Sequence, residues 1–293
     1  MRSRVLLPAV AALVFAVMLA EPARAQQQGA PGDNNVQTSV PAGRGAGGLA
    51  PAGGTGRAAG PPPAPAPRSA DGKILLWGSS PAVKGVWLPD GGAGVAMADP
   101  KTVPLQPWAA AVLENRRNFQ LEPHTRCKPS GGIRQFLTPY GVEFVEFPEL
   151  QRMYIFDIGG PHTYRTIYMD GRSHPSNLQP SYYGHSIGRW EGDTFVVDTT
   201  GFNESFWIDR RGTPHTSQLR IVERFTRVNA ISIKYEVTLD DPGAFTAPWK
   251  TGFNLRWEDG TELFEYVCQQ SNEAPNLMVG DETTIDRTSA IVP

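Results

Sequence analysis

Apolar and polar residues alternate strictly from Ile231 to Leu239, where serine, lysine, glutamate and threonine separate isoleucine, tyrosine, valine and leucine. A period of two is typical of an antiparallel strand with one face in water. The segment 219–226 alternates in the same way, and Arg227-Val228-Asn229-Ala230 lies between the two segments. The pattern therefore predicts two strands joined by a turn within 227–230.

Two further strand pairs are predicted around glycine-containing turns. Segments 187–190 and 194–199 flank Glu191-Gly192-Asp193, and segments 254–258 and 262–268 flank Asp259-Gly260. Asp-Gly between two strand-like runs is a strong hairpin signal because both turn positions tolerate a positive φ. Both pairs are interpreted as β-hairpins.

A single helix is expected, over 107–117. This segment opens with Pro107 and closes on Arg116-Arg117, as helix ends favour. Short strands recur from Phe144 onward, which indicates a barrel or sandwich. The sequence predicts an all-β fold, an antiparallel lipocalin-like (calycin-like) barrel with a short N-terminal helix.

The N-terminal part has a different composition. Residues 1–25 combine Arg2 and Arg4 with an apolar stretch and the small-x-small site Ala23-Arg24-Ala25, which predicts a signal peptide and a periplasmic or secreted protein. Residues 26–72 hold 11 Gly, 10 Ala and 8 Pro with no aromatic residue, so we expect a disordered tether. Residues 73–293 form the predicted single β-rich domain. We expect no membrane span once the signal peptide is removed.

Charge and cysteine content limit the partners and cofactors that the sequence allows. Lys and Arg number 27 against 29 Asp and Glu, a formal net charge of −2, which disfavours nucleic acid as a partner. The sequence contains neither a P-loop nor a dinucleotide fingerprint, and we expect no cofactor. Cys127 and Cys268 are the only cysteines. In an oxidising compartment they favour a disulfide, with a catalytic thiolate as the alternative.

Several motifs resemble a widespread family of exported bacterial proteins of uncharacterised function. They include CKPSGGIR from Cys127, YMDGRSHP from Tyr168, GHSIGRWEGDTFVVDTTGFN from Gly184 and EYVC ending at Cys268. Tyr183 stands where the family usually has tryptophan. The resemblance covers the chain from about residue 83 and implies export and a single domain. It implies no particular activity or cofactor.

Candidate site residues come from polar groups that the pattern places in loops or on an inward face. Glu223 is the most informative, because it shares the apolar face of its strand, where a carboxylate is costly unless it is paired. It is either a structural ion-pair partner of Arg165, Arg172 or Arg220, or an acid/base group with a raised pKa. The candidate catalytic residues are His174, His215, Asp209 and Glu223, and the candidate substrate-binding residues are Trp207, Phe206, Tyr183, Arg172 and Arg220.

Two functions remain open at this stage. The first is a periplasmic enzyme with acid/base chemistry (an isomerase, cyclase, lyase or hydrolase) acting on an aromatic, polyketide-like or terpenoid molecule in a barrel cavity. The second is a non-catalytic lipocalin-like protein that binds a hydrophobic ligand in the same cavity. The spacings of His162, His174 and His185 match no metal motif, so no metal site is predicted.

Overall fold

The computed structural model describes residues 62–78, 83–92, 102–157, 163–265 and 268. The predicted signal peptide, 1–25, and most of the predicted tether, 26–61, lie outside the described residues. All described residues belong to one compact unit. Within the described ranges, no helix is both long and apolar enough to cross a membrane.

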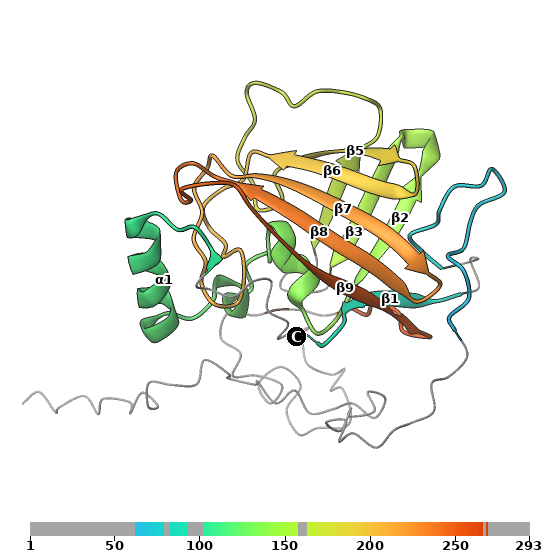
Figure 1. The fold of residues 1–293 in the computed structure, drawn as a ribbon, viewed down its shortest axis with the longest axis horizontal. Helices are drawn as coiled ribbons and strands as arrows, with labels where there is room; N and C mark the ends of the chain where they lie inside the picture. The colour runs from blue at the N-terminus through green and yellow to red at the C-terminus, as the bar shows by residue number, and fades with distance from the viewer. Residues whose placement is uncertain (1–61, 79–82, 93–101, 158–162, 266–267, 269–293) are drawn as a thin grey trace, which may run out of the picture. The chain divides into compact units, whose positions relative to one another are not determined.

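The described residues form a closed barrel of strands in the order β1 to β9 (Figure 1). The strands are β1 (Gly85–Pro89), β2 (Val142–Phe147), β3 (Arg152–Asp157), β4 (Thr163–Tyr168), β5 (His185–Glu191), β6 (Thr194–Thr200), β7 (Arg220–Asn229), β8 (Ser232–Asp240) and β9 (Trp249–Asp259). The helical elements are α1 (Pro107–Phe119) and the 3₁₀ turns η2 (Pro123–Arg126), η3 (Gly132–Leu137) and η4 (Pro148–Leu150). The predicted all-β barrel with an early helix is confirmed at this level.

The barrel is mixed. β4 and β5 pair in parallel, whereas the other neighbouring strands pair antiparallel. The prediction of a purely antiparallel sheet is wrong at this point, because the 16-residue connection 169–184 carries the chain back before β5 begins. Parallel neighbours need such a crossover, and strand alternation alone does not reveal it.

Two of the predicted hairpins are present. β5 and β6 pair from His185↔Thr200 to Glu191↔Thr194, and Gly192 has a φ of 59° in the two-residue turn between them. A positive φ at this position is the reason for a glycine. β7 and β8 pair up to Asn229↔Ser232, so their turn lies at 230–231, and Ile231 is 46% exposed instead of buried.

The hairpin predicted around Asp259-Gly260 is wrong among the described residues. β9 ends at Asp259, and residues 261–265 contain no strand. β9 pairs instead with β8 and with β1, where Trp87 stands opposite Trp257. The edge that a hairpin partner would have taken is therefore occupied by a strand from the other end of the domain.

Aromatic side chains fill the barrel interior. Phe144 of β2 contacts Phe225 of β7, with ring centroids 5.4 Å apart, although these strands are not neighbours in the sheet. Phe136 of η3 lies 4.9 Å from Tyr235 and 5.5 Å from Phe225, and all six residues of η3 are buried. These rings meet across the barrel. They occupy the part of the barrel interior where the sequence analysis expected a ligand cavity.

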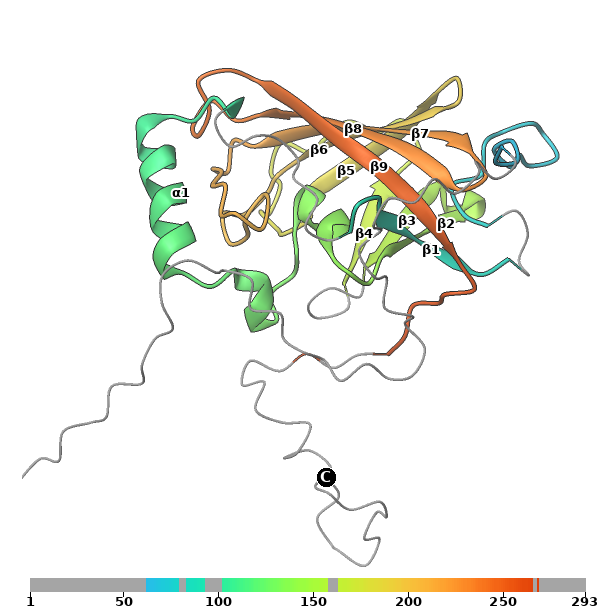
Figure 2. The same ribbon diagram turned by 60° about the horizontal axis from the view of Figure 1, so that its bottom comes forward.

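α1 lies beside one end of the barrel (Figure 2). Ala109 and Leu113 form its buried side, and Trp108 Nε1 donates to the Gly243 carbonyl at 2.9 Å. The helix begins with Pro107 in its first turn and has Arg116 and Arg117 in its last turn. The prediction of this helix is confirmed, and it ends two residues later than expected.

Cys127 and Cys268 form a disulfide, with Cα atoms 5.5 Å apart and a separation of 141 positions in sequence. It links the chain just after η2 to the segment that follows β9. The predicted pairing is confirmed, and neither sulfur is available as a thiolate. A disulfide is consistent with an oxidising compartment.

Residues 62–72, the end of the predicted tether, pack on the barrel. Ala66 contacts the core, and the Ala230 N–H donates to the Ala64 carbonyl at 2.8 Å. Arg68 donates to Asp193 in the β5–β6 turn at 2.9 Å. The ordered part of the chain therefore begins before Lys73.

Candidate functional site

The side chains predicted to form one site lie at separate places. Glu223 is inside the barrel, Tyr183 lies at the end of β3, and Phe206, Trp207, Asp209 and His215 belong to the segment between β6 and β7. Arg172, His174 and Arg220 lie on the outer face of the sheet. Each group has a different environment, and only the group with Arg172, His174 and Arg220 is open to solvent.

Glu223 is the acceptor in a fully buried network. Arg165 Nη1 donates to Glu223 Oε1 at 3.1 Å, Arg165 Nη2 donates to Oε2, and Tyr235 Oη donates to Oε1 at 2.9 Å. Arg165 also donates to Ser186 Oγ at 2.9 Å and to Thr199 Oγ1 at 2.6 Å. Each member is 1% exposed or less, and burial raises the pKa of Tyr235 well above its usual value. Of the alternatives for Glu223, the structural ion pair fits this geometry, with Arg165 as its partner.

The segment between β6 and β7 uses its polar groups to hold its own shape. Asp209 accepts from the N–H groups of Arg211 and Thr213 at 2.9 and 3.2 Å, which closes a turn. His215 is 5% exposed, lies 4.2 Å from the Phe206 ring, and has each ring nitrogen 3.2 Å from a backbone carbonyl. The hollow beside Asp209 measures about 10 Å³, the size of a single water molecule. These residues do not form the expected binding pocket.

Trp207 and Tyr183 also have structural partners. Trp207 is 6% exposed, and the guanidinium of Arg116 lies 5.3 Å from its ring centroid. Tyr183 Oη lies 2.8 Å from Thr163 Oγ1 and donates to Asp157 Oδ2 at 3.2 Å. Burial raises the pKa of Tyr183 well above its usual value, so its hydroxyl stays protonated.

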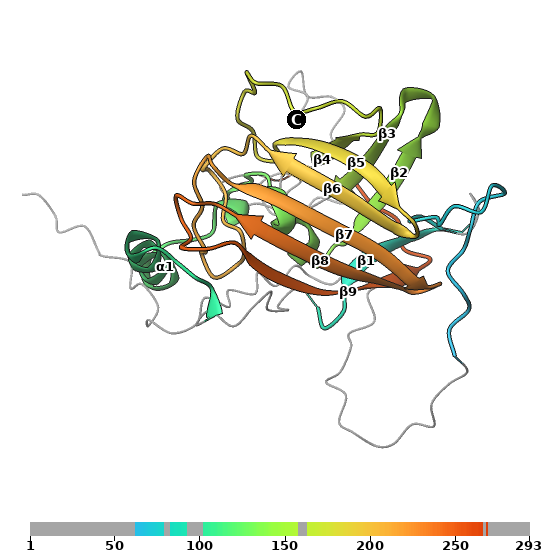
Figure 3. The same ribbon diagram turned by 45° about the horizontal axis from the view of Figure 1, so that its top comes forward.

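The polar cluster that is open to solvent lies on the outer face of β5 to β7, which faces the viewer in Figure 3. We call it the His174–His185 site, made of His174, His185, Asp198 and Arg220. His174 comes from the 169–184 connection, and its Nδ1 lies 2.9 Å from His185 Nδ1. Its Nε2 lies 3.8 Å from Asp198 Oδ1, and Arg220 donates to both oxygens of Asp198 at 2.9 and 2.6 Å.

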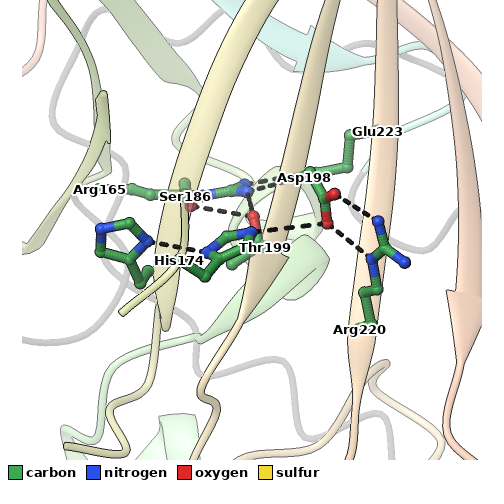
Figure 4. Close-up of polar contacts among 8 residues, drawn as sticks. Arg165, His174, Ser186, Asp198, Thr199, Arg220 and Glu223 are labelled. Atoms are coloured by element: carbon green, nitrogen blue, oxygen red, sulfur yellow. Dashed lines mark hydrogen bonds and ion pairs between the residues drawn. The ribbon is translucent and has the colours of Figure 1, made fainter. Parts of the chain in front are cut away.

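The sheet separates this site from the buried network. Figure 4 shows His174, Asp198 and Arg220 linked in one group, and Arg165, Ser186, Thr199 and Glu223 in another. Neighbouring residues of a strand point to opposite faces, so Asp198 points outward and Thr199 points inward. The two polar clusters therefore lie on opposite faces of the sheet.

The contacts favour one arrangement of protons in the site. The His174 Nε2 is buried, has no hydrogen-bond partner among the described residues and lies 3.8 Å from a carboxylate oxygen of Asp198, so the tautomer with the ring hydrogen on Nε2 is favoured by attraction to that carboxylate. The His174 Nδ1 is then an acceptor, and His185 Nδ1–H donates a hydrogen bond to it. His185 Nε2 is left with a free lone pair, and within the described part of the chain it has no hydrogen-bond partner. The His185 side chain is partly exposed, and its Nε2 faces solvent.

Electrostatics support a neutral His185 beside a charged Asp198. Partial burial lowers the pKa of His185 below 6.5, and the nearby His174 and Arg172 lower it further. Burial alone would raise the pKa of Asp198, but the hydrogen bonds and charge of Arg220 outweigh it and lower that pKa. An imidazole that is neutral near pH 7 and has one open nitrogen can accept a proton.

Tyr168 joins the site to its surroundings. Its ring stacks on His185 with centroids 5.0 Å apart and an interplanar angle of 21°. The guanidinium of Arg172 lies 3.9 Å from the Tyr168 centroid, and Arg172 Nε donates to Asp170 Oδ1 at 2.8 Å. Arg172 lies beside the site, and Asp170 already neutralises its charge.

Among the described residues, no three His, Cys, Asp or Glu side chains lie close enough together to hold one metal ion. A separate groove of about 510 Å³ lies on the outer face of β7 to β9, and Val222, Arg224 and Lys250 are among its lining residues. Val222 pairs with Asp198 across β6 and β7, so this groove adjoins the carboxylate end of the site.

Sequence reasoning therefore included His174, Arg172 and Arg220 but missed His185 and Asp198. His185 follows the glycine that opens the resembling motif, and Asp198 interrupts an otherwise apolar strand. A carboxylate within an apolar strand is the signal that could have found Asp198, as it found Glu223. The role of His185 depends on the 169–184 connection, which no spacing in the sequence indicates.

Comparison with known proteins gave no match to a family model, to a curated protein or to a solved structure. The case for function therefore depends on the geometry of the site.

Proposed function

We propose that this protein is an exported enzyme that moves a proton on a small aromatic substrate, with His185 as its general base. One observation carries the proposal: His185 Nε2 has no partner among the described residues, while His185 Nδ1 is held by His174, which lies beside Asp198. His174 and Asp198 are positioning residues in this scheme. They orient the His185 ring and compensate the charge that it acquires.

The chemistry follows from the proton arrangement. When His185 Nε2 takes a proton from the substrate, the ring becomes an imidazolium that still donates through Nδ1 to His174. The carboxylate of Asp198, fixed by Arg220, stabilises this positive charge through His174. Returning the proton to another substrate atom gives an isomerisation, and loss of a leaving group instead gives a lyase reaction. The outer face of the sheet replaces the barrel cavity as the place of reaction.

Export to the periplasm or beyond the cell is part of the same proposal. The signal-like residues 1–25 and the Cys127–Cys268 disulfide support it. We also propose that the barrel is a lipocalin-like variant with a filled interior and that the chain belongs with the exported bacterial proteins that its motifs resemble. The closed barrel and the position of His185 at the start of β5, within the longest of these motifs, support this assignment.

A non-catalytic binding protein is the second candidate. The exposed aromatic side chains on β2 and β4 favour it, because such a surface binds ligands whether or not a base lies beside it. The two candidates make different demands on His185. A binding protein uses only the shape of the His185 side chain. An enzyme also uses the ability of His185 Nε2 to accept a proton.

Deuterium exchange separates the candidates. The full mature protein is incubated in D2O with a panel of small aromatic ketones that carry an acidic C–H next to the carbonyl, and incorporation is followed by NMR. The wild type should accelerate exchange, and His185→Ala should lose roughly 10²- to 10⁴-fold of that acceleration. The wild-type rate should rise with pH and level off once His185 is neutral, with a midpoint below 6.5 because burial lowers the pKa of His185.

One further variant is a control, and a second tests the role of Asp198. Arg189→Gln changes an exposed residue on the same strand and should leave the exchange rate unchanged. Asp198→Asn should slow exchange and move the pH midpoint further down, because it removes the negative charge that stabilises imidazolium. Equal exchange in the wild type and in His185→Ala, with both proteins folded, would rule out His185 as the base.

A further inference from the structure

The outer face of β2 to β4 carries a cluster of aromatic rings next to the His174–His185 site. We call it the aromatic face, made of Phe147, Tyr154, Phe156 and Tyr164. Tyr154 lies 5.5 Å from Phe147, 6.0 Å from Phe156 and 5.9 Å from Tyr164 between ring centroids. Phe147 is 41% exposed and Tyr164 is 58% exposed. Aromatic rings gathered and exposed in this way are typical of a binding surface.

Arg152 stands between the aromatic face and the His174–His185 site. It pairs across the sheet with Phe147 on one side and with Tyr168 on the other. Its Nη1 donates to Tyr154 Oη at 3.4 Å, and its guanidinium lies 5.3 Å from the Tyr168 ring centroid. Among the described residues, no carboxylate forms an ion pair with Arg152. The neighbouring cation Arg172, in contrast, is neutralised by Asp170.

The contacts of Tyr168 place Arg152 and His185 within reach of one small molecule. Arg152 and His185 both contact the Tyr168 ring, at 5.3 and 5.0 Å from its centroid. The three residues come from β3, β4 and β5, consecutive strands of the barrel, and their side chains share the outer face. Neighbouring strands are about 4.8 Å apart, so this surface has the width of one or two aromatic rings.

We propose that the ligand of this surface is an aromatic carboxylate. Its ring packs on the aromatic face, and its carboxylate binds the guanidinium of Arg152. A guanidinium matches a carboxylate in charge and in its paired N–H donors, and among the described residues no carboxylate competes for Arg152. This inference rests on the proposed function only for the statement that the ligand is a substrate. The binding itself does not require that reaction.

Binding is tested with 3-phenylpropanoate, which has the ring and the carboxylate but no acidic C–H to exchange. Ligand-observed NMR and calorimetry on the full mature protein should detect binding at the aromatic face. The neutral amide 3-phenylpropanamide and the saturated analogue 3-cyclohexylpropanoate should each bind more weakly. Arg152→Gln should weaken carboxylate binding roughly tenfold and leave amide binding unchanged. Tyr164→Ser should weaken binding of both aromatic ligands.

Matched variants keep the two proposals apart. Arg189→Gln removes another exposed arginine of the outer face and should bind 3-phenylpropanoate as the wild type does. His185→Ala should bind it normally while losing deuterium exchange on phenylpyruvate, an aromatic carboxylate with an acidic C–H. Normal carboxylate binding in Arg152→Gln, or equal binding of acid and amide by the wild type, would overturn this inference. Binding that depends on Arg152 without any exchange would leave this inference intact and refute the proposed function.

Discussion

Glu223 and Asp198 lie on adjacent strands but face opposite sides of the sheet. Their carboxylates therefore have different partners and different roles. Glu223 points into the barrel, where it is fully buried and bound to Arg165 and Tyr235. Asp198 points outward, where Arg220 fixes it beside His174. A buried ion pair satisfies its own charges and has no access to a substrate. Asp198 is only 8% exposed, but on the outer face it lies beside an imidazole whose protonation it can tune.

Removing one partner of the buried pair should be costly. Glu223→Gln leaves the guanidinium of Arg165 buried without a counter-charge, so we expect the free energy of unfolding to fall by about 3–5 kcal/mol. The double variant Arg165→Met/Glu223→Leu should be more stable than Glu223→Gln, because it removes both charges together. Urea denaturation measures all of these variants. Glu236→Gln, which breaks an exposed pair with Lys234 on β8, is the control and should cost less than about 1 kcal/mol. A loss that small for Glu223→Gln would contradict the structural role.

At the scale of elements, the segment just before β1 packs on the barrel although it forms none of the nine strands. Ile74 and Leu76 are buried, and Arg227 donates to the carbonyls of Leu75 and Trp77 at 2.6 and 2.5 Å. Burial lowers the pKa of Arg227 to about 10, which leaves it charged at neutral pH. A guanidinium that binds carbonyl groups instead of a carboxylate holds a strand-free segment against the barrel.

Two truncations locate the start of the domain. Deleting residues 26–61 should leave the thermal midpoint unchanged, as the composition of this segment predicts. Deleting 26–72 also removes the packing of Ala66 and the hydrogen bond to the Ala64 carbonyl, so stability should fall by about 1–3 kcal/mol. Calorimetry on both proteins measures the difference. Identical midpoints would show that the contacts of residues 62–72 contribute nothing to stability.

At the scale of the whole molecule, closure of the barrel brings distant parts of the chain together. β1 pairs with β9, and the disulfide joins Cys127 to Cys268. Both links close long loops, and closing a long loop during folding costs conformational entropy. The covalent link removes much of that entropy from the unfolded chain.

The disulfide should therefore contribute strongly to stability. Replacing both cysteines by serine should lower the free energy of unfolding by about 3–5 kcal/mol, since a loop of this length loses most conformations when it is cross-linked. Chemical denaturation of the variant and of the reduced wild type should give similar losses. Thiol labelling of the unfolded, unreduced wild type should find no free thiol, and two reactive thiols would contradict the pairing.

The sequence by itself determined what depends on neighbours along the chain. Alternation placed β7 and β8 and turned Glu223 inward, Pro107 and the terminal arginines located α1, and Gly192 located the β5–β6 turn. These signals act over a few residues, so local physics specifies them. The pairing of two lone cysteines also followed, because there is only one way to join them.

Apart from the disulfide, tertiary structure decided how remote segments join. It paired β4 with β5 in parallel, placed β1 where a hairpin strand was expected on β9, and filled the barrel with the rings of Phe136 and Phe144. It also separated His174 from His215 and Glu223 and brought His174 to His185 and Asp198. Contacts of this kind depend on crossover connections and on barrel closure, which many sequences with the same local pattern could achieve differently.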